Sequence, residues 1–236
     1  MASMAPSTRK VRKPLKQKAL GRSYGGASAD ERAAERRIKL LDAGLRVFGT
    51  VGYHAGTVRM ICAEAGLTER YFYESFDNSE ALLRAVYNRI IRDVKQQTQS
   101  AMFAADRHPE AIARALLSTY FEICRDPHIA RVMLFEVLGV SPEVDHLYRQ
   151  AMGDFAAIIN TTTQMLYPQR LPVYLDQEMI SQGMIGAVVQ IAMRWVLGGY
   201  AQPLDSVVTS AYTIFVALNR YLFPQEEPQP AAEKRD

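Results

Sequence analysis

Apolar side chains recur at helical spacing along most of the chain, and this pattern predicts an all-α protein. A first helix is expected from Ser28 or Asp30 to about Thr50, with Gly52 ending it. Its apolar face comprises Ile38, Leu41, Leu45, Val47 and Phe48. After Lys95 five further helices are predicted, and that part of the sequence carries no strand signal.

Two short helical patterns meet around a tight turn between Thr57 and Phe76. Thr57 can cap the first pattern, and Thr68 can cap the second. The apolar residues of the first pattern share one face and are Val58, Ile61, Cys62 and Ala65. Gly66 stands where a chain leaving a helix commonly adopts a left-handed conformation. Two short helices joined by a glycine-containing turn form a helix-turn-helix.

The second helix of this pair would turn Phe72 and Phe76 inward and leave its polar side chains toward solvent or DNA. These side chains are Thr68, Glu69, Arg70, Tyr71, Tyr73 and Glu74. The same spacing also fits an ordinary helical hairpin in a protein core, which is the commoner structure. The spacing by itself therefore does not establish DNA binding.

A long helix is predicted to open near Asn78 and Ser79 and to extend past Lys95. Its buried side comprises Leu82, Leu83, Val86, Ile90 and Val94. The early turns would contact the helix-turn-helix, and the late turns would contact the helices of the C-terminal half. This helix should therefore bridge two domains.

The ungapped block from residue 40 to residue 83 resembles the DNA-binding domain of the tetracycline-repressor (TetR) family of bacterial regulators. The matching positions are Phe48, Gly52, Tyr53, Thr57, Val58, Ile61, Ala65, Gly66, Leu67, Thr68, Phe72, Tyr73, Phe76, Glu80, Leu82 and Leu83. Such a block is far more specific than a lone short motif. The chain departs from the family at Cys62, where Ala is usual, and at Ser79, where a phosphate-binding Lys is frequent.

The resemblance implies a three-helix DNA-binding domain that contacts double-stranded operator DNA. For base readout we expect Thr68, Glu69, Arg70 and Tyr71, with Arg70 able to address guanine. For phosphate contacts we expect Thr57, Arg59, Tyr73 and Ser79. At Ser79 a hydroxyl and a helix N-terminus can still bind phosphate without the lysine charge.

Proline and glycine divide the chain after Lys95 into helices, and Pro127 and Pro142 suit first helical turns. Bulky apolar residues here are either ordinary core or the lining of a ligand cavity, which methionine suits because it adapts to irregular shapes. The resemblance implies such a cavity for a small apolar or amphipathic effector. The candidates are Met102, Phe103, Tyr120, Phe121, Met133, Phe135, Met152, Phe155, Ile159 and Met165.

The last two predicted helices, residues 175–199 and 204–223, carry a second apolar surface. Small residues at three- and four-residue steps would let another helix approach closely. TetR-like proteins pair their last two helices into a four-helix dimer bundle, and a two-fold dimer would match a palindromic operator. The homodimer candidates are Gly183, Gly186, Ala187, Gln190, Tyr212, Phe215 and Leu218.

The net charge of +3 conceals an uneven distribution. Residues 1–29 hold seven basic side chains and no acidic ones, whereas residues 30–95 hold 11 basic and 10 acidic. The basic tail has too little apolar surface to fold alone. It is either a solvated leader or an arm that tracks phosphates or enters a minor groove. An arm would offset Glu69 and Glu74 on the second helix of the pair.

The sequence shows no pattern typical of a disulfide framework, a membrane span, a metal site or an enzyme. Cys62 and Cys124 lie far apart, which suits a reducing cytoplasm better than a disulfide framework. No uninterrupted apolar run approaches membrane-spanning length, so no membrane partner is expected. The histidines His54, His108, His128 and His146 are scattered, and the sequence has no glycine-rich phosphate loop. We therefore expect no enzyme, no metal and no cofactor.

These observations predict a two-domain, homodimeric, ligand-responsive repressor in the bacterial cytoplasm. The expected divisions are a disordered tail over 1–29, the helix-turn-helix domain over 30–78, a ligand-binding and dimerisation domain over 79–223, and a disordered tail over 224–236. Two alternatives stay open. One is a helical sensor or interaction protein without sequence-specific DNA binding, and the other is a bundle enzyme that uses its cavity.

Overall fold

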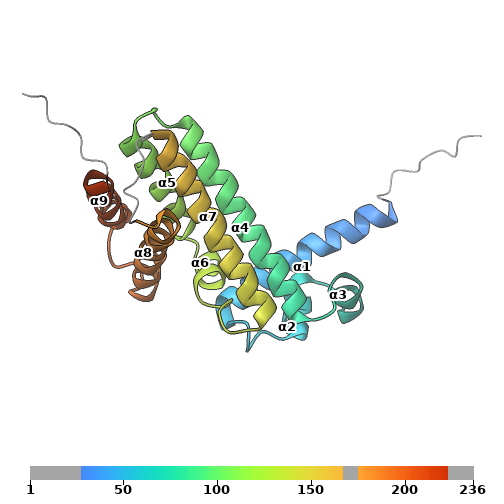
Figure 1. Ribbon diagram of the computed structural model, residues 1–236. Coiled ribbons are helices and arrows are strands. Elements are labelled where there is room, and N and C mark those ends of the chain that lie inside the picture. Colours follow the sequence, from blue (N-terminus) through green and yellow to red (C-terminus); the bar gives the residue numbers. More distant parts are fainter. Residues whose placement is uncertain (1–27, 167–174, 223–236) are drawn as a thin grey trace, which may run out of the picture.

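The computed structural model describes residues 28–166 and 175–222, and every regular element in these ranges is an α-helix (Figure 1). The helices are α1 (Ala29–Val51), α2 (Val58–Ala65), α3 (Glu69–Ser75), α4 (Ser79–Ala104), α5 (Pro109–Ile123), α6 (Pro127–Leu134), α7 (Pro142–Leu166), α8 (Gln177–Leu197) and α9 (Leu204–Leu222). The five helices expected after Lys95 are α5 to α9. Most of the basic tail, the segment 167–174 and the C-terminal segment from 223 lie outside the described residues.

Helix α1 has clear start and stop signals in its sequence. Ser28 and Glu31 form a capping box at its N-terminus, which satisfies two amides that have no partner within the helix. At the other end Gly52 takes a φ of 88°, a value that residues with a side chain rarely adopt. The inner face of α1 joins α2, α3 and the start of α4 in one core, whose fully enclosed side chains include Leu40, Phe48, Ile61, Phe72 and Leu82.

Helix α4 is the longest element and connects the N-terminal part of the fold to the rest (Figure 1). Asn78 caps it by accepting a hydrogen bond from the Ala81 amide at 2.8 Å. Its buried face extends from the helix-turn-helix to the middle of the C-terminal helices and comprises Leu82, Leu83, Val86, Tyr87, Ile90, Ile91, Val94 and Thr98. The predicted bridging helix is therefore present with the predicted inner face.

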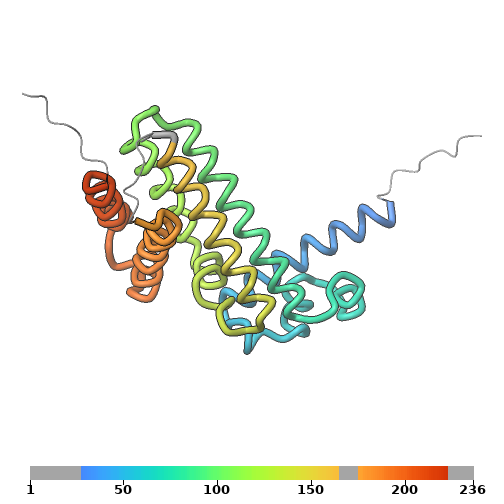
Figure 2. The backbone as a smooth tube through the Cα atoms, in the orientation of Figure 1, coloured from blue at the N-terminus to red at the C-terminus, as the bar shows by residue number. Residues whose placement is uncertain are grey.

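The C-terminal helices pack around α4 in two layers (Figure 2). Helices α5 and α7 lie against α4, whereas α8 packs on α7 and α9 packs on α5. Prolines occupy the first turns of α5, α6 and α7, where a missing amide costs no hydrogen bond. Phe121 and Trp195 meet edge to face between α5 and α8, with ring centroids 6.2 Å apart.

Helix α8 combines an apolar composition with a largely uncovered surface. Among the described residues it is the one helix long and apolar enough to cross a membrane, with a mean hydropathy of 1.3. Only 22% of that apolar window is buried within the chain itself. Length and composition alone are weak grounds for a membrane span, because a helix that packs against another protein meets the same criteria.

Candidate DNA-binding surface and ligand cavity

Helices α2 and α3 form the expected helix-turn-helix. The Thr57 hydroxyl accepts a hydrogen bond from the Met60 amide at 3.2 Å and so caps α2. Gly66 follows α2 in the left-handed conformation, with φ 65°, and the Leu67 amide donates to the Cys62 carbonyl at 2.9 Å. Thr68 is the N-cap residue of α3 by position but makes no capping hydrogen bond through its side chain. Its hydroxyl is therefore available to a ligand such as DNA.

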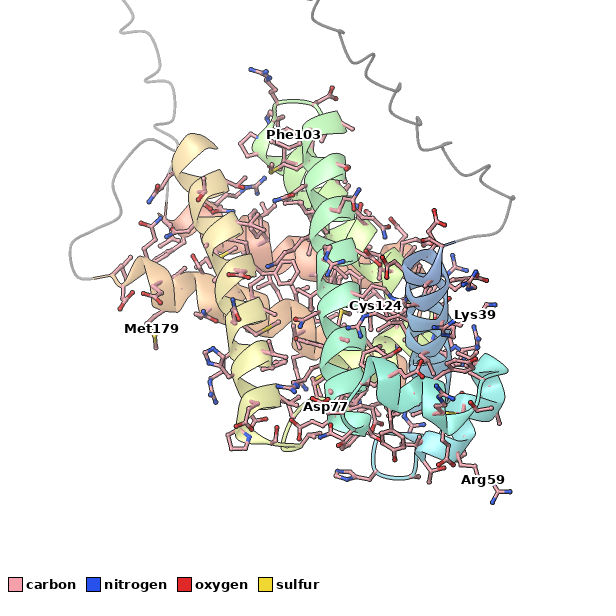
Figure 3. The ribbon with its side chains drawn as sticks, turned by 90° about the vertical axis from the view of Figure 1, so that its right-hand side faces the viewer. Lys39, Arg59, Asp77, Phe103, Cys124 and Met179 are labelled. Carbon is pink, nitrogen blue, oxygen red and sulfur yellow. The ribbon has the colours of Figure 1, made fainter. Side chains whose placement is uncertain are left out.

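Most of the side chains expected to contact DNA are exposed around these two helices. Thr57, Arg59, Thr68, Glu69, Arg70 and Tyr73 are exposed, and Ser79 is half-buried at the first position of α4. Arg59 points away from the body of the protein at the tip of this region (Figure 3). The inward-facing partners Phe72 and Phe76 are 0% and 5% exposed, as the spacing predicts.

Tyr71 differs from this group because it packs against α1. The guanidinium of Arg36 lies over its ring, 4.5 Å from the centroid, and leaves the side chain half-buried. Tyr71 therefore supports the position of α3 in this structure. The neighbouring Arg37 donates to the Ser75 carbonyl at 2.7 Å and stacks on Phe76 at 4.2 Å. Sequence reasoning did not identify either arginine.

An apolar cavity lies between α4, α5, α6, α7, α8 and α9. Its volume is about 130 Å³, and among the described residues no charged side chain lines it. Five of the predicted lining residues are present, namely Tyr120, Met133, Met152, Phe155 and Ile159. Residues that the prediction missed include Ile91, Thr98, Tyr148 and Met184. They come from three different helices, so no local pattern in the sequence brings them together.

Four of the predicted cavity residues lie elsewhere. Phe103 is 82% exposed near the end of α4, and Figure 3 shows it at the opposite end of that helix from Asp77. Phe121 is completely buried against Trp195 in the core. Met102 does not line the cavity, and its sulfur accepts a weak hydrogen bond from Thr162 at 3.7 Å. Phe135 also lies outside the lining, packed against the core, and the side chain of Met165 is outside the described set.

The residues predicted for a dimer interface divide into two groups. Gly183, Gly186 and Gln190 are exposed along α8, and Leu218 is half-buried on α9. The other three candidates are half-buried within the chain itself. Ala187 and Phe215 line the cavity. Tyr212 packs against α5, where the Arg114 guanidinium lies 4.4 Å from its ring centroid.

Comparison with known proteins identifies the helix-turn-helix. Residues 40–86 match the family model described as bacterial regulatory proteins, tetR family. This range contains α2, α3 and the opening of α4. Residues 40–86 thus form a DNA-binding domain of the kind found in TetR-family transcriptional regulators. The chain is a DNA-binding regulator and not an enzyme, as the sequence predicted.

Similar regulators cover most of the length of this chain at low identity. The uncharacterized HTH-type transcriptional regulator YdgC of Bacillus subtilis is 24% identical over 73% of the chain and 87% of its own length. The HTH-type transcriptional repressor KstR2 of Rhodococcus jostii is 24% identical over 76% of the chain and 88% of its own. The solved structure of FadR from Bacillus subtilis in complex with stearoyl-CoA superposes with a TM-score of 0.68 at 18% identity, covering 76% and 97% of the two chains.

The regulator's helix α6 touches both the cavity and α1. Met133 and Leu134 line the cavity, while Arg131 on the same helix donates to the Thr50 carbonyl at 2.6 Å. Arg131 also pairs with Glu136 at 2.8 Å, and the Glu136 carboxylate accepts from the Tyr53 amide at 2.7 Å. We call these contacts the α6 latch. The latch holds the C-terminal end of α1 and the turn that leads into the helix-turn-helix.

Glycines make the contact between α1 and α6 close. A Cβ atom at Gly49 would lie 2.5 Å from the Cα of His128, a distance that backbone atoms cannot tolerate. At Gly52 a Cβ would lie 3.0 Å from both Arg131 and Glu136. The backbone of α1 is thus in direct contact with α6, and a displacement of α6 would move the end of α1.

Proposed function

We propose that this chain is a homodimeric repressor of the TetR family that binds a palindromic operator and releases it when a small apolar or amphipathic molecule enters the cavity. The observation that carries the proposal is the double role of α6, whose residues line the cavity on one side and latch onto α1 on the other. A repressor that binds operator DNA would act in the bacterial cytoplasm.

The proposed domain division lies at the start of α4. Residues 30–78 form the DNA-binding domain, and residues 79–223 form the ligand-binding and dimerisation domain, with α4 belonging to both. At the DNA, Thr68, Glu69 and Arg70 would address bases, and Thr57, Arg59, Tyr73 and Ser79 would contact phosphates. The tyrosine hydroxyl of Tyr71 is a further base contact in this proposal. The basic tail would add phosphate contacts outside the described residues.

The dimer would form through the exposed stripe of α8, which comprises Met179, Gly183, Gly186, Gln190 and Leu197. Met179 is 69% exposed and Leu197 74% exposed, which is unusual for large apolar side chains of one helix. Gly183 and Gly186 between them would allow the backbone of a partner helix to approach closely. Figure 1 places α8 and α9 across the molecule from α3, so a two-fold axis near α8 leaves both DNA-reading helices free.

Because the wall of the cavity is mainly apolar, the effector would be mainly apolar as well. The resemblance in fold to FadR, whose solved complex contains stearoyl-CoA, makes a long-chain acyl-CoA the first candidate to test. A cavity of about 130 Å³ is close in size to one that holds a single benzene-sized ligand. A long acyl chain would therefore have to separate the surrounding helices. It can release DNA only by binding the separated state more tightly than the DNA-binding state.

The test begins with the purified full chain and sheared bacterial DNA, from which bound fragments are selected and footprinted at two salt concentrations. Stearoyl-CoA is then added, with coenzyme A alone as the control. A palindromic footprint that stearoyl-CoA removes and coenzyme A leaves in place supports the proposal. Binding that depends on salt but prefers no sequence would favour the alternative, a helical sensor without sequence-specific DNA binding.

A further inference from the structure

The wall of the cavity offers hydrogen bonds from very few groups. Thr98, Tyr120 and Tyr148 are the lining residues with a hydroxyl group, and none of the described lining residues has a charge. The Thr98 hydroxyl is already used, since it donates to the Val94 carbonyl at 2.7 Å. Two tyrosine hydroxyls, one on α5 and one on α7, are the remaining polar groups of the wall, and that of Tyr120 also hydrogen-bonds the Cys124 side chain.

A third tyrosine lies behind these two. Tyr87 on α4 is 1% exposed, and its hydroxyl has no hydrogen-bond partner among the described residues. Burial raises the pKa of Tyr87, and the nearby Tyr148 raises that pKa further. The pKa of Tyr120 is raised first by burial, then by the charge of and the hydrogen bond with Cys124, and then by Tyr148 and Tyr87. Tyr120 and Tyr148 both line the cavity, and Tyr87 lies one helical turn before Ile91, which lines the cavity from α4. Figure 3 shows Cys124, a neighbour of Tyr120, in the interior of the molecule.

We propose that Tyr120 and Tyr148, with Tyr87 behind them, form a polar end of the cavity that selects neutral effectors carrying a carbonyl or hydroxyl oxygen. Neutral tyrosines can donate to a carbonyl and can also accept from a hydroxyl. The rest of the wall supplies apolar contact alone. The part of the effector that occupies this end is thus uncharged and apolar with one oxygen function, and a carboxylate is excluded from this end.

The exclusion of anions follows from the desolvation cost. A carboxylate that enters an apolar cavity loses its water and finds neither a cation nor a cluster of free amides among the described lining residues. Two tyrosine hydroxyls do not replace that hydration. The raised pKa of each tyrosine keeps it protonated at neutral pH, so the cavity itself stays uncharged.

This inference rests on the proposed ligand-binding role of the cavity, and three probes of nearly equal shape test it. Acetophenone carries a carbonyl, cumene replaces that carbonyl by a methyl-bearing carbon, and benzoate replaces the methyl by a charged oxygen. Calorimetric titration of the full-length wild-type protein should show acetophenone binding about tenfold tighter than cumene, the equivalent of one good hydrogen bond. Benzoate should bind more weakly than acetophenone by about a hundredfold or more.

The variants Tyr120→Phe and Tyr148→Phe, singly and together, remove the hydroxyls with little change of shape. The double variant should bind acetophenone and cumene equally. Tyr212→Phe is the matched control, because Tyr212 packs against α5 and is not part of the cavity wall. It should keep the wild-type ratio. Circular dichroism of each variant checks that its helices are intact.

Several outcomes overturn the inference. These are equal binding of acetophenone and cumene to the wild type, benzoate binding as tightly as acetophenone, an unchanged ratio in the double variant, or no binding of any probe. The footprinting experiment separates this failure from that of the proposed function. If stearoyl-CoA still releases the operator, only the polar end is wrong; if no ligand affects the operator, the ligand-responsive repressor is wrong as well.

Discussion

In this structure Arg70 forms an ion pair with Glu74 on its own helix. Its guanidinium donates to the Glu74 carboxylate at 3.0 Å one turn later on α3, and Arg36 of α1 approaches the same carboxylate at 4.0 Å. The Arg70 side chain is nevertheless 83% exposed, so solvent weakens the pair and DNA can compete for the guanidinium. Glu74 would thus hold Arg70 extended along α3 without burying it.

Replacement of Arg70 by Ala tests its role in base readout. We expect the variant to lose about 1–3 kcal/mol of binding free energy and to discriminate less at one operator position, because a guanidinium can bond bidentately to guanine. Arg59→Ala is the comparison, and its phosphate contact should weaken binding to every sequence alike. Competition assays with single-base operator variants measure both. Equal loss on all sequences for Arg70→Ala would make Arg70 a phosphate contact.

The buried thiol of Cys124 should make the free energy of unfolding depend on pH in the alkaline range. Burial raises the pKa of its thiol from 9.0 to about 12, against a smaller lowering effect of the hydrogen bond with Tyr120. Between these values the unfolded chain loses a proton that the folded chain keeps. The free energy of unfolding therefore falls as pH rises above about 9, by up to about 1.4 kcal/mol per pH unit.

The variant Cys124→Ser removes this titration while keeping the size of the side chain. Urea unfolding between about pH 8 and 10, below the range in which tyrosines dominate, should give a steeper loss of stability for the wild type than for the variant. The variant can differ from the wild type in its absolute free energy of unfolding, because the test compares only how steeply that free energy falls with pH. Equal slopes of stability against pH for the two proteins would show that Cys124 has the same pKa in the folded and the unfolded chain.

At the scale of the helices, local signals in the sequence were sufficient for most boundaries. Ser28, Thr57 and Asn78 cap the helices that the sequence assigned to them, and Gly52 and Gly66 end helices with positive φ. Caps and glycines act within one helical turn, so the sequence alone contains the information. The inward face of α4 was equally predictable because its apolar residues recur at helical spacing.

Phe103 and Phe121 lie outside the cavity for two different reasons. The spacing of α4 continues from Val94 through Thr98 toward Met102, so Phe103 falls off the inner face and is exposed. This exposure could have been predicted from the sequence. Tyr120 and Phe121, by contrast, are adjacent and similar, and one lines the cavity while the other enters the core. That difference depends on how α5 is rotated against α4, α8 and α9, which no local pattern specifies.

The close contact between α1 and α6 can be tested by adding a side chain at Gly49. Gly49→Ala would bring a Cβ atom to within 2.5 Å of the His128 backbone. The two helices must separate, and we expect a loss of stability of about 1–3 kcal/mol, as for other overpacked sites. The shift should also weaken operator binding because α1 supports α3. Gly153→Ala on α7 is the control, since nothing lies within 4 Å of its added Cβ atom.

Urea unfolding and operator titration of both variants provide the measurement. In a helix, alanine is more favourable than glycine by about 0.5–1 kcal/mol, so Gly153→Ala should be neutral or more stable than the wild type. If Gly49→Ala behaved like Gly153→Ala, the close packing of α1 on α6 would not hold in solution. The α6 latch would then be too loose to transmit a change from the cavity.

For the whole molecule, the arrangement separates three surfaces along one chain. Helix α3 lies on one side and α8 and α9 lie on the other (Figure 1), while α4 to α9 enclose the cavity. Ala187 and Phe215 belong to the last two helices but face the cavity, so these helices also form part of its wall. A molecule that enters the cavity would therefore press on the proposed dimer helices as well as on α6.

Gly186 offers a test of the proposed dimer that does not depend on the fold of one chain. No atom of the described chain lies within 4 Å of a Cβ atom added there, so a larger side chain meets no obstacle within its own protomer. If α8 packs against a partner helix, Gly186→Glu would place a charge and extra bulk in that contact. The variant should sediment as a monomer at concentrations where the wild type is a dimer. It should also lose most of its operator affinity, since two half-sites are no longer bound together.

Gly153→Glu is the matched control, because that position on α7 is equally free of neighbours and lies outside the proposed interface. It should sediment and bind DNA as the wild type does. Sedimentation of the full-length proteins over a range of concentrations decides the outcome. A Gly186→Glu protein that stays dimeric would place the two-fold axis away from the α8 stripe. The half-site spacing of the operator would then have to arise from a different surface.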